Sequence, residues 1–318
     1  MKVAIIGAGA QGRQHATAFR AAGAEVGGIV AGSRASAAAA ASEVGARTYA
    51  SVDAAIADHG LDAVVVATPT ATHAAIALSA LQGGKHVFCE VPVARDAAEA
   101  RAMETAAARA GRIVQAGFLQ RFEAVWTTFV DIVLSQAFGR PIHLATERLS
   151  AFLANGLERQ HHGDAIEELL AFDIHLVLWT LGPPERVAAG ATWRDGQATD
   201  VTAAFACGAA RATCFATKDM PRGYPFTERA VMTLERGRVE ALNRFWPDRV
   251  ETLLLRHALN GVAQEVPLPS THVFVEQARH FINACHGRAD PAYAGLTHAR
   301  AVLDVVQAVR DVSQRGKP

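Results

Sequence analysis

The sequence predicts an α/β fold in which a doubly wound parallel sheet comes first and an α+β part with an open, mostly antiparallel sheet follows. The first sheet is indicated by a short apolar run, Val3–Ile6, followed directly by spaced glycines, and by strand-like and helix-like segments that alternate up to about residue 120. A long helix is expected at Arg121–Ala137. The second sheet is indicated by successive strand-like segments between residues 186 and 243, separated by turns such as Asp195-Gly196, and is expected to be a meander.

The first strand ends in a G-x-G-x-x-G motif, and a helix is expected at Arg13–Ala22. Gly7 permits a tight turn, Gly9 lets the backbone approach a pyrophosphate, and Gly12 lets the helix pack closely on the strand. The free N–H groups and the dipole of the helix start favour phosphates. These features predict a Rossmann dinucleotide-binding domain at residues 1–120. Its phosphate-binding residues are expected to be Gly7, Gly9, Ala10, Gln11 and Gly12.

The choice of coenzyme depends on the end of the second predicted strand, Val26–Ala31. An acidic residue at this place binds the ribose 2′-hydroxyl of NAD, but the chain has Gly32-Ser33-Arg34. Ser33 can donate a hydrogen bond to a 2′-phosphate and Arg34 can form a bidentate ion pair with it. We therefore expect NADP(H), with NAD(H) as the alternative. The competing interpretation is that Arg34 is a solvated loop residue.

Polar residues lie at or near the ends of three later strands of the predicted parallel sheet. Thr68 follows Ala63–Ala67, Glu90 follows His86–Cys89, and Gln115 lies within Ile113–Phe118. Ligands of doubly wound sheets bind beyond the carboxyl ends of the strands. Thr68, Glu90 and Gln115 are therefore further candidates for coenzyme contacts.

The order of these motifs resembles one oxidoreductase family. Gly7–Gly12, Thr68-Pro69-x-x-x-His73, Gly84–Pro92 and Gly117-Phe118-x-x-Arg121-Phe122 are similar to those of the glucose–fructose oxidoreductase/inositol dehydrogenase/MocA family. The resemblance implies hydride transfer between NAD(P) and, usually, a sugar or cyclitol carbon.

The resemblance also implies where the parts of the molecule lie. Thr68, Pro69 and His73 would lie along the coenzyme, and Glu90 near the nicotinamide ribose. An α+β domain at residues 121–318 would follow, with its helices at about 272–314 packing back on the first domain. One face of its sheet would cover the helix near residue 170, and the other is often a dimer interface in the family. We expect a homodimer or homotetramer.

The chain departs from the family at a position that matters for catalysis. The family has Glu-Lys-Pro where this chain has Glu90-Val91-Pro92, and the family's lysine orients the substrate hydroxyl and tunes its proton transfer. Valine has no donor, acceptor or charge and cannot do this. Lys85 is not a substitute by register, because it precedes the strand.

The family's second motif, Asp-x-x-x-His followed by Trp-Leu-x-Gly, is also incomplete. Counting back from Trp179 and Gly182 puts Glu168 at the aspartate, Phe172 at the histidine, and His175 at a later family aspartate. A second register puts His175 at the histidine and Ala171 at the aspartate.

The spacing of Asp164, Glu168, Phe172, His175 and Trp179 places them on one face of a predicted helix. Glu168 and His175 beside an apolar ring are the candidate catalytic acid/base residues. The alternative is that Glu168 is a partly solvated helix residue and His175 a hydrogen-bonded core histidine.

Composition excludes several other classes of protein. Lys+Arg and Asp+Glu are both 31, so a nucleic-acid or polybasic membrane binder is not expected. The four scattered cysteines favour reduced thiols and a cytoplasmic protein. No apolar stretch is long enough to span a membrane. His161-His162 is not completed by nearby ligands, so no metal is expected.

Together these features predict an NADP(H)-dependent oxidoreductase acting on a small carbonyl or hydroxyl compound, sugar-like or cyclitol-like, or on an imine, with an atypical active site. Segments 150–165 and 218–227 are expected to determine its specificity. The alternative function is coenzyme binding with a non-redox step, such as elimination, or with no turnover.

Overall fold

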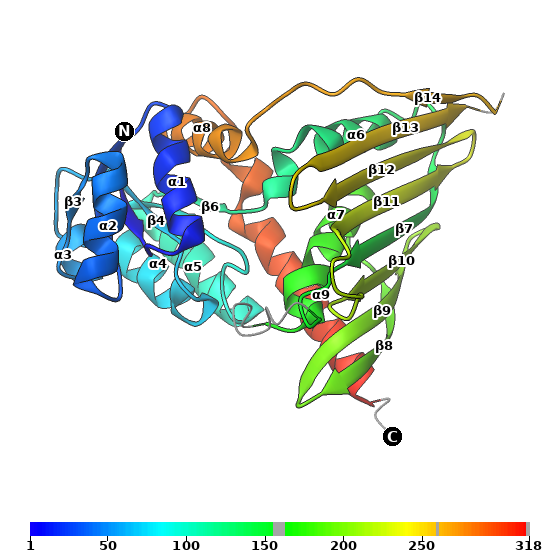
Figure 1. Ribbon diagram of the computed structural model, residues 1–318, viewed down its shortest axis with the longest axis horizontal. Coiled ribbons are helices and arrows are strands. Elements are labelled where there is room, and N and C mark those ends of the chain that lie inside the picture. Colours follow the sequence, from blue (N-terminus) through cyan, green and yellow to red (C-terminus); the bar gives the residue numbers. More distant parts are fainter. Residues whose placement is uncertain (155–162, 259–260, 316–318) are drawn as a thin grey trace. The chain divides into compact units, whose positions relative to one another are not determined.

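The computed structural model describes residues 1–154, 163–258 and 261–315. The chain divides into two compact units (Figure 1). Unit 1 consists of Met1–Glu123 and Thr271–Arg300, and unit 2 of Ala124–Ser270 and Ala301–Pro318. Unit 1 is therefore completed by a segment from late in the chain.

Unit 1 contains a six-stranded parallel sheet in the order β3-β2-β1-β4-β5-β6. The strands are β1 (Lys2–Ile6), β2 (Glu25–Val30), β3 (Arg47–Thr48), β4 (Ala63–Val66), β5 (His86–Cys89) and β6 (Val114–Ala116). β1 and β4 are continuous apolar runs because both faces of the sheet are covered, and Val3–Ile6 and Ala63–Val66 are almost fully buried. This order is that of a Rossmann fold.

Two groups of helices pack on this sheet. The first is α1 (Ala10–Ala21), α2 (Arg34–Val44) and α8 (Val273–Cys285), and the second is α3 (Val52–Ile56), α4 (His73–Gln82) and α5 (Ala97–Ala110). Phe19, Phe88 and Phe281 meet edge to face, with each pair of ring centroids 5.7 to 5.9 Å apart. The segment from late in the chain thus supplies part of the core of unit 1.

Unit 2 contains an eight-stranded sheet in the order β14-β13-β12-β11-β7-β10-β9-β8. Its strands are β7 (Pro141–Leu149), β8 (Arg186–Arg194), β9 (Gln197–Cys207), β10 (Ala210–Thr217), β11 (Phe226–Leu234), β12 (Gly237–Phe245), β13 (Val250–Ala258) and β14 (Ala263–Glu265). β7 and β10 pair in parallel and the other neighbours are antiparallel. The predicted α/β fold with a mostly antiparallel second sheet is confirmed.

Helices cover one face of this second sheet (Figure 1). α6 (Ala124–Leu134) packs on β12 and β13, and α7 (Ala171–Leu181) packs on β7 and β10. The last helix, α9 (Leu296–Arg315), begins in unit 1 and continues in unit 2. On the opposite face of the sheet, Phe215 of β10 is 36% exposed.

Three predictions about unit 2 are corrected by the structure. The helix predicted at Arg121–Ala137 is limited to α6, and a 3-10 turn, Leu119–Arg121, precedes it. The second sheet is not a simple meander, because β7 lies between β10 and β11, and β13 and β14 were not foreseen. Asp164 does not share a helix face with Glu168, because it precedes the helix and a π-helical turn, Ile166–Leu170, follows it.

Candidate coenzyme and acid–base sites

The glycine turn of unit 1 has the geometry that a bound pyrophosphate needs. Gly7 has φ of +114°, and a Cβ there would lie 2.2 Å from the carbonyl oxygen of Ala67. A Cβ at Gly12 would lie 1.9 Å from the carbonyl oxygen of Gly7, whereas one at Gly9 would meet no atom within 4 Å. Gly7 and Gly12 therefore shape the turn, and Gly9 borders open space.

The start of α1 lies beside this space. Gly9 is the N-cap of α1, no side chain among the described residues caps it, and no acidic residue lies in the first helical turn. Ala10 and Gln11 are exposed. Backbone N–H groups at a helix N-terminus bind phosphate, so Gly9, Ala10 and Gln11 fit the pyrophosphate of a dinucleotide.

Ser33 and Arg34 lie at the junction of β2 and α2. Ser33 is the N-cap of α2, and its Oγ accepts a hydrogen bond from the Ser36 amide at 3.2 Å and lies 2.7 Å from Ser36 Oγ. Both Ser33 and Arg34 are exposed. A phosphate at this helix start would meet two hydroxyl groups and one guanidinium.

His73 joins two loops at the carboxyl edge of the parallel sheet. The His73 ring is 1% exposed, with Nε2 2.7 Å from the carbonyl oxygen of Thr68 and Nδ1 2.8 Å from that of Pro92. Both nitrogens therefore face the backbone. Thr68 is half-buried and Pro69 is exposed, so they are the members of this motif that a ligand can reach.

Glu90 is held from two sides. One carboxylate oxygen pairs with Nε2 of buried His15 on α1, and the other accepts a hydrogen bond from the Val91 amide at 3.2 Å. A Cβ at Gly117 would come within 2.8 Å of Glu90 Oε2. The carboxylate thus links the β5 end to the helix that follows the glycine turn.

Gln115 differs from the other coenzyme candidates because its side chain points into unit 1. It is 1% exposed, its Nε2 donates to the carbonyl oxygen of Gln277 at 3.1 Å, and its Oε1 lies 2.8 Å from His280 Nδ1. Through these contacts the side-chain amide of Gln115 joins β6 to α8 inside unit 1.

Val91, which the resemblance to the family aligns with a lysine, is half-buried. Lys85 does not compensate, because its Nζ donates to the carbonyl oxygens of Asp58 and Leu61, both at 2.8 Å. Burial lowers the pKa of Lys85. Within unit 1 the position after Glu90 therefore carries no charge.

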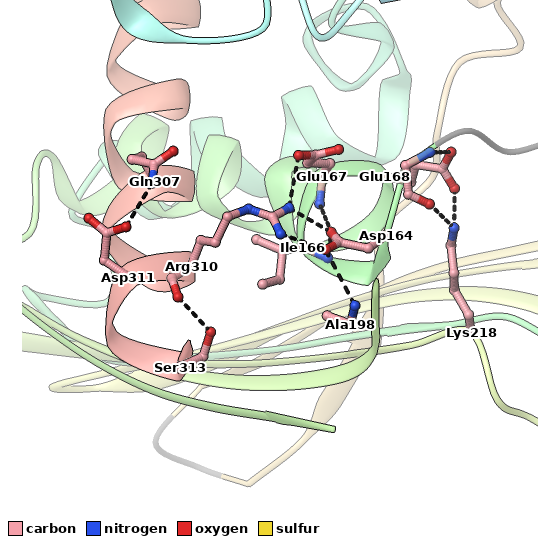
Figure 2. Close-up of polar contacts among 11 residues, drawn as sticks. Asp164, Ile166, Glu167, Glu168, Ala198, Lys218, Gln307, Arg310, Asp311 and Ser313 are labelled. Atoms are coloured by element: carbon pink, nitrogen blue, oxygen red, sulfur yellow. Dashed lines mark hydrogen bonds and ion pairs between the residues drawn. The ribbon is translucent and has the colours of Figure 1, made fainter. Parts of the chain in front are cut away.

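In unit 2, Glu168 lies in the π-helical turn and forms an ion pair with Lys218, which follows β10 (Figure 2). Its Oε1 accepts a hydrogen bond from the Gly163 amide at 2.7 Å. The Glu168 side chain is 20% exposed and the Lys218 side chain 5%. Glu168 is thus a fixed, partly exposed carboxylate beside an ammonium group.

The turn that carries Glu168 is anchored by Asp164 and Arg310 (Figure 2). Asp164 Oδ1 accepts hydrogen bonds from the amides of Ile166 and Glu167. Arg310 of α9 binds both Asp164 oxygens, at 2.8 and 3.0 Å, and Glu167 at 2.8 Å. Burial raises the pKa of Glu167, while Arg310 opposes that shift.

His175 lies in α7 and has no exposed surface. Its ring centroid is 5.6 Å from the Trp179 ring. Beside it, Phe172 lies against the guanidinium of buried Arg148, which is 5.1 Å from the Phe172 ring centroid. His175 is therefore a core residue in this structure, whereas Phe172 and Glu168 are partly exposed.

Arg148 is the centre of a buried charged cluster that the sequence analysis missed. It forms an ion pair with Glu228 of β11 and lies 3.5 Å from Oδ1 of Asp173. Asn243 donates to Glu228 at 3.3 Å. Burial raises the pKa of Asp173 to about 7, although Arg148 acts in the opposite direction. Arg148 lies on the same face of β7 as buried Leu144 and Thr146, and the two-residue period of a strand is the signal in the sequence that could have placed it there.

Residues 1–154, 163–258 and 261–315 contain no group of three His, Cys, Asp or Glu side chains that could hold a metal ion. His161 and His162 lie outside these ranges. Within them, no helix is both long and apolar enough to cross a membrane, and the four cysteines are free.

The sheet order and the glycine turn define unit 1 as a dinucleotide-binding Rossmann domain. Residues 1–118 match the model of the GFO_IDH_MocA family, described as an oxidoreductase family with an NAD-binding Rossmann fold. This part of the chain is therefore similar to that family.

Two curated relatives show what the chain is similar to. It is 33% identical over 182 residues to UDP-N-acetylglucosamine 3-dehydrogenase of Acidithiobacillus ferrooxidans, covering 57% of this chain and 55% of that protein. It is 30% identical over 184 residues to inositol 2-dehydrogenase 3 of Saccharopolyspora erythraea, covering 57% and 54%. The matched region spans about half the length of these curated relatives.

Solved structures extend the similarity to both units. The A. ferrooxidans UDP-N-acetylglucosamine 3-dehydrogenase aligns with 99% of this chain and 98% of its own, with a TM-score of 0.86 and 25% identity. An aldose-aldose oxidoreductase from Caulobacter crescentus aligns with 100% and 98%, with a TM-score of 0.86 and 19% identity. The second match shows the fold alone.

Proposed function

We propose that this protein is an NADP(H)-dependent oxidoreductase acting on a small sugar-like or cyclitol-like alcohol or carbonyl compound, or on an imine. The observation that carries the proposal is the open space at Gly9, beside the uncapped start of α1, in a unit that matches an NAD-binding family. Curated relatives named as dehydrogenases of a UDP-sugar and of inositol support the substrate class.

The preference for NADP over NAD rests on Ser33 and Arg34. The 2′-phosphate of NADP carries negative charge, and exposed Arg34 beside two hydroxyl groups matches it. Arg34→Ala should weaken NADPH binding at least tenfold and NADH binding less than twofold, as measured by fluorescence titration. Exposed Arg20, near the end of α1, supplies the control Arg20→Ala, expected to change neither affinity. Equal losses for the two coenzymes would remove Arg34 from the site.

When bound, the coenzyme supplies or accepts the hydride, and the chain must move the proton. Glu168 is the preferred proton-transfer residue because it is partly exposed, whereas His175 is fully buried. Glu168→Gln should lower kcat at least tenfold. If Glu168→Gln and His175→Ala both leave turnover unchanged, the assignment to either residue is wrong.

Val91 and Phe172 favour a second candidate, a coenzyme-binding protein with a non-redox step or no turnover. Both side chains are apolar at positions where the family has a lysine and a histidine, so neither can transfer a proton. The absorbance of reduced nicotinamide distinguishes the candidates across a panel of UDP-sugars, inositols, aldoses, ketones and imines. A coenzyme-dependent change in this absorbance with one class of compound supports the oxidoreductase. No change with any class of compound supports the second candidate.

The helix-free face of the unit 2 sheet is proposed as the surface of a homodimer or homotetramer. Arg229 on this face contacts Glu147 and Glu240 at 3.3 and 3.4 Å, so charges of both signs lie together there. Phe215 adds an exposed ring. Light scattering of wild type and Phe215→Glu tests this surface, and a monomeric wild type would exclude it.

A further inference from the structure

We propose that Lys218 is a positioning residue for Glu168, so that the two side chains work as one unit in the reaction. This inference rests on the proposed function, because it deepens the part assigned to Glu168. It is carried by a closed set of contacts within unit 2 that joins Lys218, Glu168 and Gly163. Figure 2 shows the pair of Lys218 and Glu168.

The backbone of Lys218 is fixed before its side chain makes any contact. Its amide donates to the carbonyl oxygen of Thr199 at 2.8 Å, and its own carbonyl accepts from the Leu153 amide at 3.1 Å. The side chain is 5% exposed. Few rotamers are open to a long side chain that is buried and held at its base, so the ammonium has a defined location.

Gly163 is bound by both members of the ion pair. Its carbonyl oxygen accepts a hydrogen bond from Lys218 Nζ at 2.5 Å, and its amide donates to Glu168 Oε1 at 2.7 Å. A Cβ at Gly163 would lie 2.8 Å from Glu168 Cγ, so the close approach requires glycine. Both oxygens of Glu168 are therefore oriented, one by the amide and the other by Lys218.

The ammonium retains capacity for a ligand. It has three N–H donors, and in the part of the chain that the structure describes, its contacts to Gly163 and Glu168 use two of them. One donor remains for an oxygen atom of a substrate held at Glu168. A fixed cation–carboxylate pair also limits reorganisation while charge changes during proton transfer.

The kinetic experiment compares Lys218→Met with Lys218→Arg. Lys218→Met should lower kcat at least tenfold with the NADPH dissociation constant unchanged, and Lys218→Arg should recover most of the loss. The matched control is Arg194→Met, which breaks the exposed Arg194–Asp219 pair beside Lys218 and should leave kcat unchanged. The double variant Glu168→Gln/Lys218→Met should be no slower than the slower single variant. Additive losses, or wild-type kcat in Lys218→Met, would overturn the proposal.

A second measurement separates this inference from the proposed function. Amide hydrogen exchange in segment 163–168 should accelerate in Lys218→Met at unchanged melting temperature, because the Gly163 contacts are lost. Unchanged exchange refutes the positioning role even if the protein is an active oxidoreductase. Accelerated exchange in a protein that turns over no substrate of the panel supports the positioning of Glu168 and refutes the proposed reaction.

Discussion

Two single-methyl substitutions in the glycine turn should separate coenzyme binding from folding. In Gly12→Ala, the new Cβ would lie 1.9 Å from the Gly7 carbonyl oxygen, about 1.5 Å short of ordinary contact. The backbone of the turn must move, at a cost of about 1–3 kcal/mol for overpacking. That cost lowers the melting temperature by roughly 2–10 °C for a unit of this size.

In Gly9→Ala, the methyl group meets no protein atom within 4 Å, and the φ of −71° is open to alanine. Stability should stay within about 0.5 kcal/mol of wild type. The methyl group instead occupies the space assigned to the pyrophosphate, so NADPH affinity should fall at least tenfold, about 1.4 kcal/mol.

The assay combines thermal unfolding without coenzyme and NADPH titration by fluorescence. Gly12→Ala should melt early, and Gly9→Ala should melt like wild type and bind weakly. Wild-type affinity in Gly9→Ala would refute the placement of the pyrophosphate, and a wild-type melting temperature in Gly12→Ala would refute the steric argument.

Three further predictions concern stability, each measured by urea unfolding. Burial raises the pKa of Asp173 from 3.8 to about 7, so the native protein retains a proton and loses stability as pH rises from about 4 to 7. Asp173→Asn should therefore gain up to about 4 kcal/mol over wild type between pH 4 and pH 8, and a pH-independent difference contradicts this. Burial lowers the pKa of His298 from 6.5 to about 3, so its contribution is present above pH 6.5 and is lost as pH falls. His298→Asn should reduce the loss between pH 6.5 and 5 by about 2 kcal/mol, and an unchanged acid sensitivity would count against it. Arg310→Met leaves the buried Asp164 carboxylate without its cation and should lower the free energy of unfolding by about 3 kcal/mol. Arg140→Met, at an exposed ion pair, should lower it by less than about 1 kcal/mol. Equal losses in the two variants would disprove the distinction between buried and exposed pairs.

The parallel sheet of unit 1 was predictable from local sequence. Val3–Ile6 and Ala63–Val66 are buried on both faces, so each strand appears as an uninterrupted apolar run that ends at a turn. The glycine motif also indicated that a helix follows the first strand. The start of α1 was misplaced, at Arg13 instead of Ala10, because the helix begins inside the glycine motif.

The strand order of unit 2 was not predictable in the same way. β7 pairs with β10 and β11, more than 60 residues later in the chain, and no local pattern records such pairing. β13 was missed because Leu254 is its only buried residue, so the strand lacks the alternation of buried and exposed side chains.

The candidate acid/base residues could be proposed from the sequence, but the residues that surround them in the structure could not. Lys218 lies 55 residues from its partner Gly163, and Arg310 lies 146 residues from Asp164. Charged residues are usually exposed, so composition gave no reason to place these side chains in the interior. Regular helical spacing also placed Asp164 on the same helix face as Glu168. This was wrong because Asp164 precedes the helix and the turn at Ile166–Leu170 is π-helical.

The discontinuity of unit 1 has a consequence during synthesis. Phe281 and Ala278 of α8 are fully buried in the core formed with Phe19 and Phe88. A nascent chain that has reached residue 123 has made the whole parallel sheet but leaves this core uncovered. The ribosome must translate all of residues 124–270 before α8 can complete unit 1. During that interval an apolar surface is available to chaperones, and truncation before α8 should produce an aggregation-prone fragment.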